Sequence, residues 1–154
     1  CIIKYKHDII GRNSRLDTIH AAILDIKLKN LDLNNSKRRE NAYLYNNLLK
    51  EIENIEIPKI EKDCLPVYHL YIIKTDYRDA LQEYLKKNNI ESGIHYPISI
   101  YELECYKNKI IHSSIPQNSI NNSKRILSLP MYPDLTKKEI EIICTKIKNF
   151  FNVI

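Results

Sequence analysis

The sequence is poor in glycine and lacks the short motifs that mark the common catalytic sites. Only two glycines, Gly11 and Gly93, occur among its 154 residues. Phosphate-binding loops and dinucleotide-binding turns need several closely spaced glycines, so P-loop, kinase-type and dinucleotide sites are excluded within this chain. An H-E-x-x-H motif, a His/Cys cluster at metal-ligand spacing and a nucleophile elbow are also absent. We therefore expect neither a metal site nor a hydrolase-type catalytic site in these residues.

The spacing of the cysteines and the lack of a long apolar run predict the cellular compartment of the protein. Cys1, Cys64, Cys105 and Cys144 lie far apart and form no C-x-x-C pair. The sequence shows no signal peptide and no apolar run of membrane-spanning length. These features predict reduced thiols in a cytoplasmic protein that does not enter the membrane. Because the chain begins at Cys1 without a translation start, we also expect it to be a piece of a longer protein.

The composition is that of a folded domain with a basic balance. Hydrophobic residues make up 44% and charged residues 28%, as in ordinary globular proteins. The net charge of +5 suits a nucleic-acid-binding module. However, the lysines alternate with acidic residues over 51–62 and 137–148, which is typical of solvated helix faces. A basic helical module that binds nucleic acid or a protein therefore remains the less favoured alternative.

Hydrophobic periodicity predicts several helices. Apolar residues recur at helical spacing from Leu16 to Leu31, and their stripe is broad enough to pack on two sides. Asn13 or Ser14 is expected to cap this helix, and 34–36 to bend or break it. Further helices are predicted over 37–52, 77–88 and 118–126, and after the capping box Thr136–Glu139.

Segments rich in β-forming residues lie between these helices. We predict extended structure over 55–59, 67–74 and 90–96, with His69 packed in the core. The segment Leu127 to Pro133 contains two prolines, which exclude a regular helix, and it is predicted as a rigid turn. The order of elements predicts an α+β fold in which helices cover one face of a small antiparallel sheet.

Two polar clusters stand at predicted junctions. Arg12-Asn13-Ser14-Arg15 precedes a helix, where free backbone N–H groups and guanidinium groups together can bind an anion. His95 and Tyr96 end a predicted strand, where hydrogen-bond donors can face a ligand. Each cluster also has a purely structural interpretation: a capped helix with arginines in solvent, and a satisfied His–Tyr pair. The residues alone favour these structural interpretations.

Taken in order, several segments resemble the DegT/DnrJ/StrS family of pyridoxal-phosphate (PLP) dependent nucleotide-sugar aminotransferases. The matching segments are Lys4–His7, Ile10–Gly11, Asn13–Asp17, Ala21–Leu24, Val67–Tyr71, Gly93–Pro97 and Leu127–Pro133. The resemblance implies the C-terminal small domain of the aspartate-aminotransferase-like fold, known as fold type I. Residues 1–12 would then be a lead-in from a large PLP-binding domain, and residues 13–154 the small domain with its interdomain helices.

The same resemblance implies function. Members transfer an amino group, usually from glutamate, to a keto-sugar on a nucleotide diphosphate, in pathways such as polysaccharide biosynthesis. They act as homodimers, with PLP as the electron sink. Asn13 and Arg15 are implied as cofactor-binding residues: Asn13 would reach the cofactor phosphate of the neighbouring subunit, and Arg15 would lie near the same interface, with an ion pair within its own subunit as the alternative. His95 and Tyr96 are implied as substrate-binding residues. No lysine here matches the Schiff-base motif, so the chain alone is not expected to be active. A PLP-dependent sugar dehydratase of the same family is the alternative.

Overall fold

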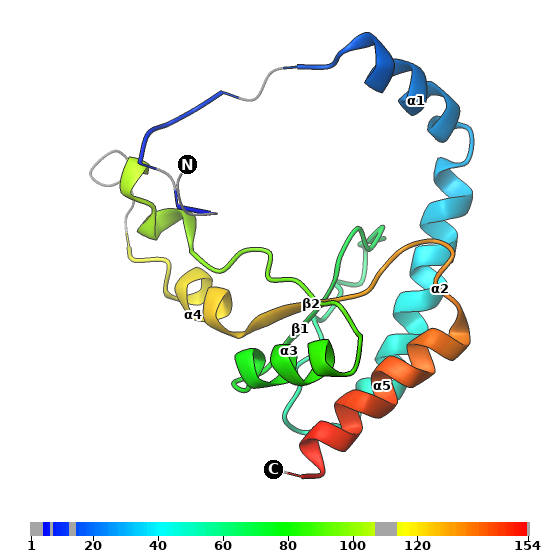
Figure 1. Cartoon of the computed structure of the whole chain (residues 1–154). Coiled ribbons are helices and arrows are strands. Elements are labelled where there is room, and N and C mark those ends of the chain that lie inside the picture. Colours follow the sequence, from blue (N-terminus) through cyan, green and yellow to red (C-terminus); the bar gives the residue numbers. More distant parts are fainter. Residues whose placement is uncertain (1–4, 7, 13–14, 107–113, 154) are drawn as a thin grey trace.

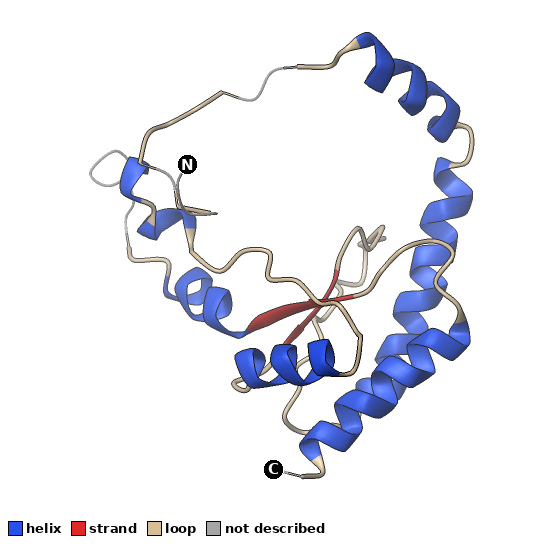
Figure 2. Ribbon diagram, in the orientation of Figure 1, coloured by secondary structure: helices blue, strands red, loops and turns tan. Residues whose placement is uncertain are grey.

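The computed structural model describes residues 5–6, 8–12, 15–106 and 114–153 (Figure 1). It contains five α-helices, two short 3-10 helices and two strands within these residues (Figure 2). Along the chain they are α1 Thr18–Leu28, α2 Leu31–Leu49, β1 Tyr71–Lys74, α3 Arg78–Lys87, η1 Ile100–Glu102, η2 Glu104–Tyr106, α4 Gln117–Arg125, β2 Ile126–Leu129 and α5 Lys137–Phe151. The predicted α+β class is confirmed.

The sheet consists of β1 and β2, which pair antiparallel with Tyr71 opposite Leu129. Glu56 forms a single bridge to Lys74 of β1, and Gly93 forms one to Ser128 of β2. The extended segments predicted over 55–59 and 90–96 thus contribute one bridge each to the sheet. The strand predicted over 67–74 is correct only in its second half.

The prediction for residues 126–129 was wrong, because they form strand β2 rather than the end of a helix and a turn. Leu127 and Leu129 are buried in the core, as expected for a strand that packs beneath helices. Pro130 follows the last strand residue, so it ends β2 without removing a hydrogen bond from the ladder. The placement of His69 in the core was also wrong, since His69 is exposed and precedes β1.

The core lies where α2, α3 and α5 pack with the sheet. Tyr45 of α2 and Tyr71 of β1 stack with ring centroids 4.6 Å apart. The Tyr45 hydroxyl donates to the Pro130 carbonyl at 3.0 Å, and the Tyr71 hydroxyl donates to Asn46 Oδ1 at 2.7 Å. Burial raises the pKa of both phenols well above the ordinary value. Both tyrosines therefore stay protonated and act as hydrogen-bond donors at neutral pH.

The predicted capping box at the start of α5 is confirmed. The Thr136 hydroxyl accepts from the Glu139 backbone N–H at 3.3 Å, and the Glu139 carboxylate accepts from the Thr136 backbone N–H at 2.8 Å. Hydrogen bonds from Thr136 lower the pKa of Glu139. These contacts satisfy backbone donors that the first turn of a helix would otherwise leave open.

The predicted end of the first helix was misplaced. The break falls at Lys29 and Asn30, and α2 runs without interruption through 34–36. Asn34, Asn35 and Ser36 are half-buried, so tertiary surroundings outweigh the weak helix propensity of these residues.

Helix α1 differs from the expectation that it packs on two sides, because it buries no residue in this chain. Figure 1 shows α1 well apart from the sheet, at the end of α2. Its large apolar side chains, among them Ile19, Ile23, Leu24, Ile26 and Leu28, are exposed.

Two smaller expectations concern thiols and membranes. Cys64, Cys105 and Cys144 are free thiols in the structure, and Cys1 lies outside the described residues. Burial raises the pKa of the Cys144 thiol to about 12, so this thiol is unreactive at neutral pH. No helix within the described ranges is long and apolar enough to cross a membrane.

Candidate functional site

His95 lies against the free edge of β2, in contact with a residue far away in the sequence. The Gly93 N–H donates to the Ser128 carbonyl at 3.0 Å, and the Ser128 N–H donates to the Gly93 carbonyl at 2.7 Å. This bridge brings His95 Nδ1 to 2.9 Å from Ser128 Oγ. The structure therefore joins two segments that the sequence analysis treated separately, Gly93–Pro97 and Leu127–Pro133.

Gly93 is required for this arrangement by the close approach of the histidine ring. A Cβ atom on Gly93 would lie 2.6 Å from Cε1 of His95, which is far too close for carbon atoms. Any larger residue at this position would push the imidazole away from β2. Glycine thus allows the ring to fold back over its own strand.

Tyr96 continues the site toward solvent. Its side chain is 60% exposed, and its ring lies edge-on to the His95 ring with centroids 5.7 Å apart. The ring of Tyr5 lies 5.5 Å from that of Tyr96, so the N-terminal segment returns to this region. A groove of about 340 Å³ is lined by Tyr5, Tyr96, Ile98, Ile100 and Leu103. His95 and Tyr96 therefore place polar groups beside an apolar surface, a combination common in ligand sites.

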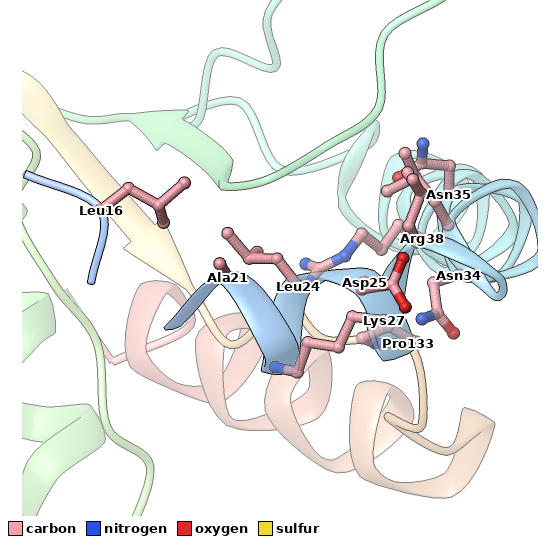
Figure 3. Close-up of a pocket in the computed structure, with 11 residues that line it drawn as sticks. Leu16, Ala21, Leu24, Asp25, Lys27, Asn34, Asn35, Arg38 and Pro133 are labelled. Carbon is pink, nitrogen blue, oxygen red and sulfur yellow. The ribbon is translucent and has the colours of Figure 1, made fainter. Parts of the chain in front are cut away.

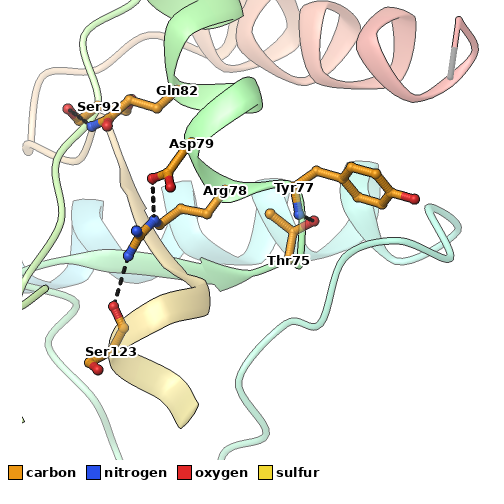
Figure 4. A network of polar contacts seen from close by, with 7 residues as sticks. All are labelled: Thr75, Tyr77, Arg78, Asp79, Gln82, Ser92 and Ser123. Carbon is orange, nitrogen blue, oxygen red and sulfur yellow. Dashed lines mark hydrogen bonds and ion pairs between the residues drawn. The ribbon is translucent and has the colours of Figure 1, made fainter. Parts of the chain in front are cut away.

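A polar network on α3 supports the His95 segment (Figure 4). Gln82 Nε2 donates to the Ser92 carbonyl at 3.2 Å, which holds the residue before Gly93. Arg78 donates from Nε to Asp79 at 2.7 Å and from Nη1 to the Ser123 carbonyl at 2.8 Å. These bonds tie α3 to α4 and to the loop that carries His95.

The other predicted cluster is arranged differently from the expectation. Asp17 caps α1, since its carboxylate accepts from the His20 N–H at 2.9 Å and lies 2.7 Å from His20 Nδ1. A carboxylate of the chain itself thus occupies the helix N-terminus that we expected to attract an anion. Arg15 is exposed, and Asn13 lies outside the described residues. The cofactor-binding role of Asn13 and Arg15 therefore stays a prediction.

A groove larger than the one beside Tyr96 lies elsewhere, between α1 and α2 (Figure 3). It has a volume of about 660 Å³ and a largely apolar lining that includes Leu16, Leu24, Leu28, Leu31 and Pro133. Arg38 lies at this groove, but its Nη1 donates to the Met131 carbonyl at 2.9 Å. The groove holds none of the predicted substrate-binding residues, so we place the candidate site at His95 and Tyr96.

Ion pairs on the opposite edge of the sheet are structural. Arg125 lies 2.7 Å from a carboxylate oxygen of Glu56 and also pairs with Asp76. The hydrogen bond from Arg125 lowers the pKa of Glu56. No group of three or more His, Cys, Asp or Glu side chains suited to a metal ion occurs in the part of the chain that the structure describes.

The sequence analysis missed Ser128 and Gln82 as residues of the site. A serine between two leucines in a buried strand was the available signal for Ser128, because a buried hydroxyl needs a hydrogen-bond partner. The identity of that partner could not be read from the sequence. Gln82 carries no comparable signal.

Comparison with known proteins shows where this architecture belongs. Residues 2–148 match the model of the DegT/DnrJ/EryC1/StrS aminotransferase family. The dTDP-3-amino-3,6-dideoxy-alpha-D-galactopyranose transaminase of Aneurinibacillus thermoaerophilus is 36% identical over 149 residues, which are 96% of this chain and 40% of that protein.

Solved structures agree with the sequence match. A DegT DnrJ EryC1 StrS aminotransferase from Brucella abortus superposes with a TM-score of 0.82 at 32% identity, covering 97% of this chain and 39% of that one. The S. venezuelae protein DesV, solved in complex with a ketimine intermediate, gives 0.80 at 29% identity, covering 97% and 40%. The chain thus spans about 40% of the length of these relatives. The predicted relation of the fold to these enzymes is confirmed, and the chain belongs to the DegT/DnrJ/EryC1/StrS aminotransferase family.

Proposed function

We propose that the protein containing this chain is a PLP-dependent aminotransferase that acts on a nucleotide-linked keto-sugar, with glutamate as amino donor. The match of residues 2–148 to an aminotransferase family carries this proposal. The relative from Aneurinibacillus thermoaerophilus, named as a transaminase of a dTDP-linked amino sugar, supports the substrate class. A cytoplasmic homodimer that serves amino-sugar or polysaccharide biosynthesis is the setting that we propose for this activity.

His95 and Tyr96 are the proposed substrate-binding residues. The His95 ring is half-buried against β2, with Nδ1 2.9 Å from Ser128 Oγ. In this proposal its other nitrogen, Nε2, meets the ligand. Tyr96 is mostly exposed beside a groove with an apolar lining. Imidazole N–H and phenol O–H groups are suited to donate to the charged oxygens of a diphosphate.

Asn13 and Arg15, the residues implied to bind the cofactor, have side chains that can donate hydrogen bonds to a phosphate group. Arg15 has an exposed guanidinium group, which binds phosphate oxygens in a bidentate manner. Arg15 and Asn13 would hold the phosphate of PLP bound to the neighbouring subunit. When bound, PLP supplies the electron-withdrawing ring that amino transfer needs. Within this chain, the residues bind and orient, and the lysine that carries the cofactor is proposed to lie in another part of the protein.

The proposed domain arrangement accounts for the uncovered α1. Residues 1–12 would lead in from a large PLP-binding domain, and residues 13–154 would form the small domain. The apolar side chains of α1 would then be covered by the rest of the protein or by the neighbouring subunit. The length of the relatives, of which the chain spans about 40%, leaves ample protein for this contact.

Amino transfer by the intact protein tests the proposal. We expect the intact protein with PLP to turn over glutamate to 2-oxoglutarate repeatedly only when a nucleotide-linked keto-sugar is supplied, and to release the amino sugar in equal amount. Without the sugar, no more than one 2-oxoglutarate is expected for each bound PLP. The 154-residue chain alone should form no stable internal aldimine with PLP, and borohydride should fix PLP to no one lysine in preference to the others. Loss of water from the sugar without use of glutamate would favour the dehydratase and contradict the proposed reaction.

A further inference from the structure

Ser128 is a polar residue at a position otherwise suited to an apolar one. It lies in β2 between Leu127 and Leu129, and only 4% of its surface is exposed. A hydroxyl buried in such surroundings destabilises the fold unless it forms a hydrogen bond. Its partner among the described residues is His95, whose Nδ1 lies 2.9 Å from Ser128 Oγ.

The backbone of Ser128 is held from both sides. Its N–H and its carbonyl are bonded to Gly93, at 2.7 and 3.0 Å. On the other side of β2, Ser128 lies opposite Ile72 of β1. The strand therefore fixes the Cα–Cβ direction of Ser128, and the contact with His95 Nδ1 gives the hydroxyl its orientation. The missing side chain at Gly93 leaves room for the His95 ring to reach it.

This geometry bears on which ring nitrogen of His95 carries the proton. A neutral imidazole has one donor nitrogen and one acceptor nitrogen, and a serine hydroxyl can either donate to Nδ1 or accept from it. A buried hydroxyl proton needs an acceptor, and among the described residues Nδ1 of His95 is the group placed against Ser128 Oγ. The direction that satisfies this proton leaves Nδ1 unprotonated and makes Nε2 the N–H donor of the ring.

We propose that Ser128 is a positioning residue that holds His95 in its Nε2–H form, so that His95 donates a hydrogen bond to an anionic oxygen of the nucleotide-sugar diphosphate. The inference rests on the proposed function, in which His95 binds substrate. The inference explains why β2 has a serine at position 128, and it identifies Nε2 of His95 as the atom that contacts the ligand.

The first test measures the ring proton directly and needs neither cofactor nor substrate. The chain has five histidines, so selective 15N-histidine labelling gives a simple long-range 1H–15N spectrum. His95 is assigned by its loss in His95→Gln. We expect its Nε2–H form to dominate, and Ser128→Ala to give a mixture of both tautomers. A His95 protonated at Nδ1, or a tautomer unchanged in Ser128→Ala, overturns the proposal.

The second test uses kinetics of the intact protein with PLP. We expect Ser128→Ala to raise KM for the nucleotide sugar about five- to tenfold, while kcat and KM for glutamate change less than about twofold. Ser128→Thr, which keeps the hydroxyl, should restore both KM and the Nε2–H form. In a His95→Ala background, Ser128→Ala should have no further effect on KM, because it acts through His95.

The outcomes separate this inference from the proposed function. If the intact protein transfers no amino group, the proposed function fails, whatever the tautomer of His95. If amino transfer occurs but Ser128→Ala raises KM equally in the presence and absence of His95, Ser128 does not act through His95 and the inference fails alone. Should Ser128→Ala not fold, Ser128→Cys keeps the size with a weaker donor and is expected to show the same shifts in smaller measure.

Discussion

Helices α1 and α5 are both rich in apolar residues at helical spacing, yet their surroundings are opposite. Helix α5 buries Ile140, Ile143, Cys144 and Ile147 against α2 and α3, and its first turn is closed by a capping box. Helix α1 buries nothing, although Ile19, Ile23 and Ile26 repeat in the same way. Periodicity thus shows that a helix has an apolar side, but not which partner covers it.

The different burial of α1 and α5 indicates which of the two helices stabilises this chain by itself. Burial of apolar surface stabilises a helix by about 25 cal/mol per Å², so α5 contributes to the fold of this chain and α1 does not. An exposed apolar surface as large as that of α1 marks an interaction site. The proposed contact of α1 with the remainder of the aminotransferase follows from this principle.

The largest expected effect compares two isoleucines, one on each helix. Ile147 of α5 is 0% exposed and Ile19 of α1 is 73% exposed. Ile147→Ala should lower the free energy of unfolding of the chain by about 2–5 kcal/mol, because it leaves a cavity in the core. Ile19→Ala should change it by less than about 0.5 kcal/mol. Urea unfolding followed by circular dichroism measures both, and equal effects would refute the contrast between the helices.

The same Ile19→Ala change in the intact protein sharpens the comparison. If α1 is covered there, as proposed, the substitution should cost about 2 kcal/mol or more in unfolding or subunit association. Thermal unfolding and sedimentation of the intact protein provide the measurement. A cost as small as in the isolated chain would show that α1 stays uncovered.

A smaller effect is expected at Arg38, which links α2 to the segment after β2. Its Nη1 donates to the Met131 carbonyl at 2.9 Å, and Arg38 is half-buried. Arg38→Ala should destabilise the chain by about 1–2 kcal/mol, because a partly buried carbonyl loses its donor. Arg15→Ala, which removes the same charge from the exposed segment before α1, serves as the matched control and should have little effect on unfolding.

The smallest expected effect is on the stability of the folded chain at acidic pH. Arg125 lowers the pKa of Glu56 below its ordinary value of 4.5 in the folded chain. The unfolded state therefore binds the proton more readily, and the stability from this pair is present above pH 4.5 and lost as the pH falls through the lowered pKa. Glu56→Gln should flatten the pH dependence of unfolding in this range. Glu61→Gln, which makes the same charge change away from Arg125, serves as the matched control. An identical pH profile for Glu56→Gln and the wild type would contradict the role of the pair.

Parts of the fold could be predicted because they depend on residues close together in the chain. The capping box needs only Thr136 and Glu139, three positions apart, and it was placed correctly. The helix after Tyr77 and the α+β order likewise follow from local periodicity. The strand β2 was not predicted because a four-residue strand has little local sequence signal, and because Pro130 and Pro133 indicate a turn.

In the candidate site, too, some residues could be predicted from the sequence and others could not. His95 and Tyr96 could be proposed because hydrogen-bond donors at the end of a predicted strand can face a ligand, and their substrate-binding role remains a proposal. Ser128 could not be added, since it lies 33 positions from His95 and meets it only through the bridge at Gly93.

The sequence by itself determined the helix-forming segments, the α5 cap and membership in the aminotransferase family, because these are carried by short motifs and local periodicity. Only the tertiary structure decided that Ser128 contacts His95, that residues 126–129 pair with β1, and that α1 is left uncovered. The physical reason is common to all three. Each depends on a contact between residues far apart in the sequence. Local sequence patterns predict neither which hydrogen bonds form over such distances nor which surfaces become buried.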